Sequence, residues 1–385
     1  MYKIKIGLLP KIIIAIALGI ACGFVFGDAI TRIFITFNSI FGNFLGFLIP
    51  LIIIGLVAPA IMDVGKGAGR ILLITTVLAY AFTIFSGFFT YGIVDLTFPA
   101  LLKSESIPNL TSVDNALAPY FTINMPPLMD VMTALITAFV VGLGMSAIGS
   151  KWIKGTMDEL RVIVMLIIQK IIIPLLPIYI FGIFLNITVS GQVASILGIF
   201  LKLIVVIFAI TLVVLLLQFT IAGIVARKNP LKMLGKMATA YATALGTQSS
   251  AATIPVTLEQ TIKCGVRPEI AGFTVPLCAT IHLSGSTIKI TACALAILML
   301  HNTPISPSLI SGFIMMLGIT MVAAPGVPGG AIMACLGLLQ SMLGFSEIDN
   351  GLMIALYITM DSFGTAANVT GDGAIALIVN KIAKQ

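Results

Sequence analysis

The stretch MDSFGTAANVTGD, from Met360 to Asp372, is the most informative part of this sequence. Its polar residues include Asp361, Thr365, Asn368 and Asp372. Their successive spacings of four, three and four residues put them on one face of a helix, about 16 Å long at 1.5 Å per residue. A charged group at the centre of a bilayer costs about 2.5 to 3.5 kcal/mol. Because the surrounding stretch is apolar, the face indicates a binding site, the alternative being packing against other polar helices.

Composition places the chain in a membrane. Hydrophobic residues make up 59% and charged residues only 9%, against roughly a quarter in soluble proteins. The mean hydropathy is +1.16. Apolar stretches run almost from end to end, so we expect residues 1–385 to form a single membrane unit without a soluble domain. The five cysteines lack ligand spacing, which argues against a zinc site or a disulfide framework. The net charge of +7 is scattered between apolar stretches, so no nucleic acid partner is expected.

The apolar pattern predicts an all-α polytopic membrane protein. We expect spans at 7–26, 40–62, 71–98, 127–148, 162–187, 193–225, 271–300 and 352–382. Two further segments, 237–262 and 307–344, are broken midway by Ser, Pro or Gly clusters, and broken helices at membrane depth are tolerated only where they line a cavity or are buried in protein. We therefore expect eight transmembrane helices plus two re-entrant helical hairpins. A plain ten-span arrangement keeps both termini on the same side as well.

Basic residues indicate the topology. They fall in alternate loops: Lys3, Lys5 and Lys11, then Lys66 and Arg70, then Lys151, Lys154 and Arg161, then Arg227, Lys228, Lys232 and Lys236, with Lys381 and Lys384 at the end. The positive-inside rule then puts both termini in the cytoplasm. The basic start resembles a secretory signal but has no convincing cleavage site, so we expect a retained first span. The expected location is the inner (cytoplasmic) cell membrane.

The seventh predicted span contains IHLSGSTIK, Ile281 to Lys289, with two ionisable residues inside an apolar stretch. Gly285 between two serines favours local unwinding of the helix. His282 is either a satisfied polar core residue or a proton site. Lys289 either belongs to the site or extends to the outer interface of the membrane.

Taken together, these motifs resemble the dicarboxylate/amino acid:cation symporter family over nearly the whole chain. TQSSAATIPVTLE (247–259) resembles its serine-rich first hairpin tip, AAPGVPGGA (323–331) its second tip, and NVTGD (368–372) agrees residue for residue with its last helix. The resemblance implies an elevator-type transporter and a homotrimer. A scaffold subdomain (about 7–62 and 127–187) would stay fixed, while a transport subdomain (about 71–98 and 193–382) moves across the bilayer.

The resemblance also implies a site. Asp361 would hold the ammonium of an amino acid and Asn368 its main carboxylate. The remaining substrate-binding positions would be Ser249, Ser250, Ser286, Val327, Gly329, Gly364 and Thr365. Sodium would bind at Asp372 with Asn368, and at a second site near Thr280 and the backbone of Ala323. A proton is the alternative coupling ion, and no organic cofactor is expected.

Departures from the family pattern bear on the substrate. Acidic-substrate members carry an arginine where this chain has Gly364, and many microbial members carry one where it has Gln248. Neither residue can replace the bidentate pair of arginine with a side-chain carboxylate. The aspartate that accompanies that arginine is Tyr357 here. A small neutral amino acid is therefore the expected substrate.

The seventh span also departs from the family. Its asparagine-methionine-aspartate-glycine-threonine motif reads HLSGS (282–286), which puts in doubt the deepest sodium site and its third-span hydroxyl, at Thr83 here. We hypothesise that the Lys289 ammonium stands in for a sodium ion.

Other function classes are weaker. An acidic amino acid or dicarboxylate symporter with a non-arginine site, an uncoupled carrier and an anion-conducting relative all remain open. An enzyme is not expected, because neither His282 nor His301 has an evident partner at useful spacing.

Overall fold

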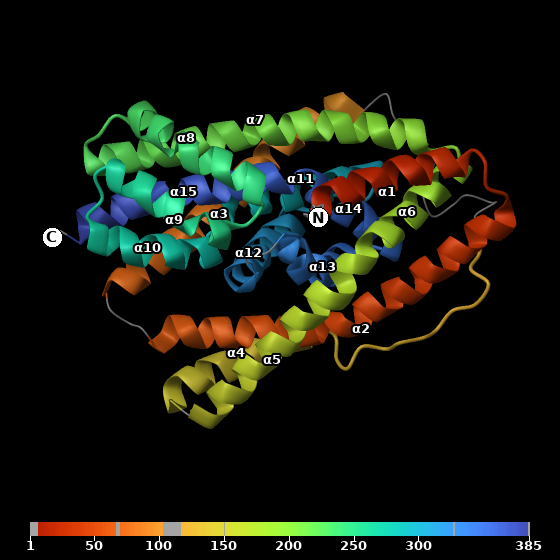
Figure 1. Cartoon of the computed structure of the whole chain (residues 1–385), viewed down its shortest axis with the longest axis horizontal. Coiled ribbons are helices and arrows are strands. Elements are labelled where there is room, and N and C mark those ends of the chain that lie inside the picture. The colour runs from red at the N-terminus through yellow and green to blue at the C-terminus, as the bar shows by residue number, and fades with distance from the viewer. Residues whose placement is uncertain (1–6, 67–69, 103–116, 150, 326–327, 384–385) are drawn as a thin grey trace, which may run out of the picture.

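The computed structural model describes residues 7–66, 70–102, 117–149, 151–325 and 328–383. These residues form helices joined by turns and short irregular segments (Figure 1). The helices in chain order are α1 (Leu8–Gly23), α2 (Asp28–Lys66), α3 (Arg70–Leu102), α4 (Val131–Ile148), α5 (Lys151–Ile167), the π-helical turn η1 (Ile168–Ile172), α6 (Ile173–Val189), α7 (Val193–Ala226), α8 (Pro230–Thr247), α9 (Ser250–Lys263), α10 (Pro268–Ile281), α11 (Ser284–Leu300), α12 (Pro307–Ala323), α13 (Gly330–Leu343), α14 (Glu347–Thr359) and α15 (Asp361–Ile382).

Within the described ranges, five helical stretches are long and apolar enough to cross a membrane. They are 28–62, 70–101, 151–189, 193–226 and 268–300. The pair α14 and α15 makes a sixth if it counts as one span, although the two helices meet at 62°. The all-helical membrane architecture is thus confirmed at this coarser level. All eight predicted spans are helical, but α1 and the apolar part of α4 (Thr133–Ile148) are shorter than a full span.

Several predicted boundaries were wrong. α2 starts at Asp28 rather than 40, and it continues through two prolines, Pro50 and Pro59. The predicted span 162–187 belongs to a longer stretch, 151–189, that includes η1. Polar and basic residues at the ends of these helices hid their length, because a hydropathy pattern records only the apolar part of a helix.

The two predicted mid-segment breaks are present. α8 ends at Thr247, and the next residue, Gln248, turns the chain with a left-handed φ of 53°. The Ser249 hydroxyl then caps α9 by accepting from the Ala252 amide. α13 follows Gly329, where φ is 73° and a side chain would be strained. We call α8 with α9 the first hairpin and α12 with α13 the second hairpin.

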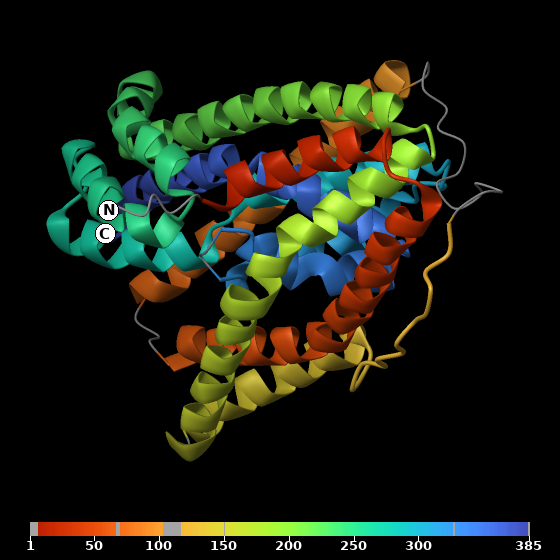
Figure 2. The same ribbon diagram turned by 45° about the vertical axis from the view of Figure 1, so that its right-hand side comes forward.

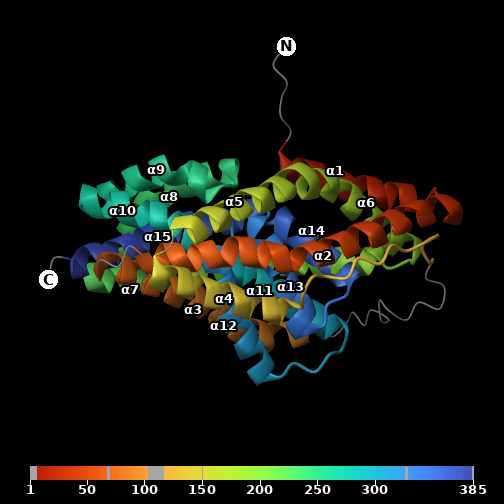
Figure 3. The ribbon, with the colours of Figure 1, turned by 90° about the horizontal axis from the view of Figure 1, so that it is seen from below.

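The helices pack as two interleaved groups. α2 packs against α4, α5 and α6, and α1 lies along α6. In the other group, α15 contacts α7, α8, α9, α10 and α11, and α11 also packs against α3. Figure 2 shows the first group most clearly, with the red α1 lying along the yellow-green α6. α8, α9 and α10 gather near the carboxyl-terminal end of α15 in Figures 1 and 3. α15 is therefore enclosed by protein for nearly its whole length.

The basic turns gather at one end of the molecule. The α7–α8 and α9–α10 turns lie at the end where α15 terminates, and the α6–α7 turn lies at the opposite end (Figure 1). Lys228 and Lys236 donate to backbone carbonyls of the α9–α10 turn there, at Cys264 and Lys263, over 2.6 Å each. This arrangement agrees with the alternation of basic loops. Which end faces the cytoplasm stays a prediction.

Candidate functional site

Both hairpin tips reach the first turn of α15. The Gly329 amide of the second hairpin donates to Asp361 Oδ2 over 2.9 Å. The Gln248 side-chain amide of the first hairpin donates to the Ser362 hydroxyl over 3.0 Å. This junction follows the bend at Met360, where α14 ends and α15 begins. The candidate site is therefore built from three chain breaks that meet in space.

The polar face of α15 is buried. Asp361, Thr365, Asn368 and Asp372 are all buried, with no more than 6% of any of them exposed. They lie on a continuous helix that begins at Asp361. The predicted ladder of polar side chains thus points into protein rather than into lipid.

An ion pair occupies the amino-terminal end of this ladder, at Asp361. Lys289 Nζ from α11 lies 3.0 Å from Asp361 Oδ1, and only 1% of the lysine side chain is exposed. The same ammonium lies 3.6 Å from the centre of the Tyr357 ring, within the range of a cation–π contact. The alternative in which Lys289 extends to the membrane interface is wrong, because Asp361 supplies a buried partner that the sequence separation of 72 residues concealed.

Gly364 makes room for Lys289. A Cβ at this position would lie 2.3 Å from Lys289 Cε and 2.5 Å from Nζ. The space that a side chain at 364 would enter is thus already filled by a cationic group from another helix. The sequence shows only the missing side chain, and nothing in its spacing connects Gly364 with the lysine 75 positions earlier.

The middle of the ladder is held by a chain of hydrogen bonds. Asn368 Oδ1 accepts from the Gly285 amide over 2.8 Å, and its Nδ2 donates to Ser286 Oγ over 3.2 Å. Ser286 also bonds to the Tyr357 hydroxyl over 2.9 Å. The break between α10 and α11, at His282 and Leu283, leaves the Gly285 amide without a partner inside its own helix, so this amide is free to donate to Asn368. Predicted site residues Ser286 and Asn368 are therefore in direct contact.

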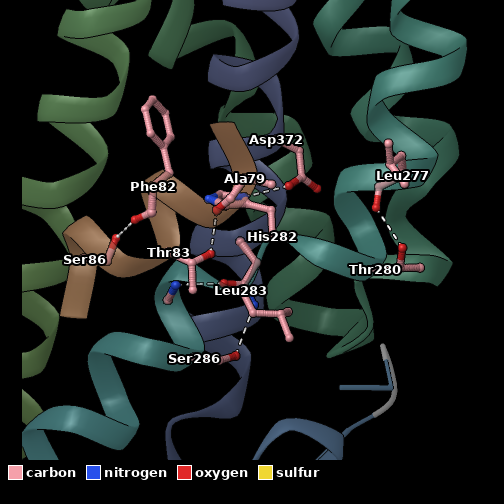
Figure 4. A network of polar contacts seen from close by, with 12 residues as sticks. Ala79, Phe82, Thr83, Ser86, Leu277, Thr280, His282, Leu283, Ser286 and Asp372 are labelled. Atoms are coloured by element: carbon pink, nitrogen blue, oxygen red, sulfur yellow. Dashed lines mark hydrogen bonds and ion pairs between the residues drawn. The ribbon is translucent and has the colours of Figure 1, made fainter. Parts of the chain in front are cut away.

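The carboxyl-terminal end of the ladder, at Asp372, holds a second buried pair. His282 Nδ1 lies 2.9 Å from Asp372 Oδ1, and both side chains are almost fully buried (Figure 4). His282 Nε2 and Asp372 Oδ2 have no hydrogen-bond partner in the described part of the chain. Neither does the side-chain amide of Gln218. A Cβ on Gly371 of α15 would meet both His282 and Gln218, so these two side chains pack against α15 beside Asp372.

Both histidines have a partner in the structure that no sequence spacing indicated. His282 pairs with Asp372 across 90 residues, and His301 Nε2 lies 2.7 Å from Asp349 Oδ1. Asp349 also completes a capping box with Ser346 at the start of α14. Contacts this distant in sequence leave no spacing signal.

The hydroxyls of α3 bond within their own helix. Thr83 donates to the Ala79 carbonyl and Ser86 to the Phe82 carbonyl, as Figure 4 shows. Each hydroxyl oxygen still has lone pairs to offer a cation.

The other predicted positions are spread over two places. Ser250 is buried in the first turn of α9, whereas Ser249 is committed to its cap. Thr280 and Ala323 line a cavity of about 420 Å³ between α2, α3, α5, α10 and α12, and Asp361 is not among its lining residues. Val327 lies outside the described residues. Among the side chains that the structure describes, no three His, Cys, Asp or Glu residues form a metal cluster.

A buried polar site on broken helices inside an apolar bundle defines a membrane transporter. The chain belongs to the Sodium:dicarboxylate symporter family, whose model matches residues 8–382. The family assignment makes it a transporter rather than an enzyme.

Several curated proteins are similar along most of the chain. The serine/threonine transporter SstT of Acinetobacter baumannii (strain AYE) is 29% identical over 96% of this chain and 95% of its own length. SstT of Streptococcus suis is 26% identical over 86% of this chain and 93% of its own length. An excitatory amino acid transporter of Caenorhabditis elegans is 25% identical over 74% of this chain and 58% of its own length.

Proposed function

We propose that this protein is a secondary active transporter that couples the uptake of a small neutral amino acid to sodium. The observation that carries the proposal is the occupied space at Gly364. A side chain there would collide with Lys289, whose charge is already paired with Asp361. The described site therefore offers no unpaired cation to a second carboxylate. The similarity to transporters named for serine and threonine supports a neutral substrate.

In this proposal the coupling ion binds at the carboxyl-terminal end of the ladder, beside Asp372. Asp372 Oδ2 is a buried oxygen that has no hydrogen-bond partner among the described residues, which suits a hard cation such as sodium. His282 occupies the other carboxylate oxygen, so a proton is the alternative ion at this place. A second sodium would use the backbone near Ala323 and Thr280. In this proposal Lys289 supplies a fixed positive charge in place of one further sodium ion.

We further propose the elevator arrangement. Eight spans and two re-entrant hairpins would divide into a scaffold of α1, α2, α4 and α5 to α6, and a transport subdomain made of α3 and α7 to α15. The packing of α15 against α7 to α11 and of α2 against α4 to α6 supports this division. A homotrimer and cytoplasmic termini in the inner membrane are part of the same proposal.

The elevator can be tested by a crosslink. A Cβ on Gly337 of α13 would lie 2.4 Å from Ile49 Cγ2 of α2, so the two positions face each other across the proposed boundary. A disulfide between I49C and G337C, in a background without the native cysteines, should stop transport until it is reduced and should leave substrate binding intact. Transport that continues at full rate in the crosslinked protein would contradict a moving subdomain.

The function itself is tested in liposomes. Purified protein should accumulate labelled serine, threonine or alanine when an inward sodium gradient is imposed, and not when sodium is equal on both sides. A pH gradient in sodium-free buffer tests the proton alternative. Preferential uptake of aspartate, or currents that ignore the substrate gradient, would contradict the proposal.

A further inference from the structure

The pair of Lys289 and Asp361 fills the place expected for a substrate ammonium. Asp361 Oδ1 faces Lys289 Nζ at 3.0 Å, and Asp361 Oδ2 accepts the Gly329 amide at 2.9 Å. Both carboxylate oxygens are thus in use, and the tip of the second hairpin is tied to one of them. An ammonium group that binds Asp361 therefore competes with Lys289 for the negative charge of this carboxylate.

A displaced Lys289 would need another anion. The cavity beside it, about 330 Å³, is lined mainly by apolar residues of α7, including Ile207 and Phe208. Thr211 also lines it, but its hydroxyl is donated to the Ile207 carbonyl. The Tyr357 ring offers a cation–π contact but no full charge. Because an unpaired buried ammonium is strongly disfavoured, a ligand has to bring the anion with it.

We propose that Lys289 is a substrate-binding residue that passes from Asp361 to the carboxylate of the substrate. This inference rests on the proposed amino acid transport. The substrate ammonium takes the Asp361 oxygen that Lys289 leaves, and the substrate carboxylate takes the Lys289 ammonium. One ion pair becomes two, no covalent bond changes, and the buried net charge stays at zero. The short distance from Lys289 to Gly364 leaves the lysine stem next to the ladder along which the substrate lies.

The exchange selects for zwitterions. A plain amine would occupy Asp361 and leave Lys289 without an anion. A plain carboxylate would draw Lys289 away and leave Asp361 with only the Gly329 amide. A ligand that carries both groups, as an α-amino acid does, satisfies both residues.

The experiment compares a zwitterion with its amide. Binding of L-serine and of L-serinamide, which keeps the ammonium and lacks the carboxylate, is measured calorimetrically on the full chain in detergent. The native protein should bind serine at least about 30-fold more tightly, the lower range for truncating a buried charge pair. In K289M the serine affinity should fall, because the substrate carboxylate loses its cation. The serinamide affinity should rise, because the ammonium of serinamide no longer competes with Lys289 for Asp361. The ratio should drop to about one or below.

Two further variants serve as controls. K289R keeps a cation and should keep the preference for serine. K202M removes a lysine of α7 whose ammonium bonds to the Leu101 carbonyl over 3.2 Å, and it should leave both affinities unchanged. If K289M does not elute as a single species, the ratio is measured on K289Q.

The outcomes separate the inference from the function on which it rests. An unchanged serine-to-serinamide ratio in K289M, or an equal loss of both ligands, would make Lys289 a structural residue and overturn the inference. A native preference for aspartate that K289M abolishes would assign the ammonium to a side-chain carboxylate and overturn it as well. If the native protein binds no neutral amino acid, the proposed function fails before any variant is compared, and the inference fails with it.

Discussion

Replacing Gly364 by alanine tests the close packing of α15 against Lys289. The added Cβ would lie 2.3 Å from Lys289 Cε, well inside contact distance, so the end of the buried lysine has to shift into the cavity beside it, which strains its pair with Asp361. Overpacking of this kind costs about 1 to 3 kcal/mol, whereas alanine in place of glycine inside a helix gains about 1 kcal/mol. We expect a net loss of about 0 to 2 kcal/mol and a weaker ion pair between Lys289 and Asp361.

The assay is a double-mutant cycle on thermal stability in detergent. G364A should lower the unfolding midpoint by a few degrees in the native background. In the K289A background the obstructing atoms are gone, so the same change should be neutral or stabilising by up to about 1 kcal/mol. The interaction energy of the cycle is then about 1 to 3 kcal/mol, within the range for residues in contact.

A matched glycine provides the control. Gly92 lies inside α3, and a Cβ there would meet nothing within 4 Å. G92A should therefore be neutral or slightly stabilising in both backgrounds. If G364A destabilises the protein equally with and without the Lys289 side chain, the reasoning about this contact is refuted.

Three other predictions concern the proposed cation site, the start of α14 and the tip of the first hairpin. D372N should weaken sodium-stimulated substrate binding at least about tenfold, because it removes the charge that His282 and the proposed cation share; unchanged sodium dependence would refute the assignment. S346A should cost about 1 kcal/mol of stability by removing the cap of α14, as measured by thermal unfolding, and S346T should restore most of it. Q248A should cost about 0.5 to 1.5 kcal/mol through its lost bond to Ser362 and should raise hydrogen exchange at the first hairpin tip, a rise that a tip held by other contacts would not show.

The elements that sequence analysis predicted well are those with a local signal. The spacing of Asp361, Asn368 and Asp372 identifies one helical face, and the structure buries that face. The breaks after Gln248 and before Gly329 follow from turn-forming residues within a few positions. Periodicity and turn chemistry depend on residues only a few positions apart, so both can be recognised from the sequence without the tertiary structure.

The pairings inside the site carry no such signal. Lys289 meets Asp361, and His282 meets Asp372, only because the break between α10 and α11 lies against α15. One indirect signal was available: the chain lacks a side chain at Gly364 and has an additional cation at Lys289. A cationic side chain missing at position 364 and a lysine present at position 289 suggest that Lys289 fills the space that the side chain at position 364 would otherwise take.

The pair of Lys289 and Asp361 has a consequence for the return half of a transport cycle. An alternating-access carrier has to reset without its substrate, and an isolated carboxylate carried through a medium of low dielectric constant would be expensive. In the proposed cycle the positive partner would travel on the same chain, and the Gly329 amide, which donates to Asp361 Oδ2, would keep the second hairpin over the pair. The empty carrier can therefore reset with this carboxylate neutralised from within, so that no counter-transported ion is needed at that position.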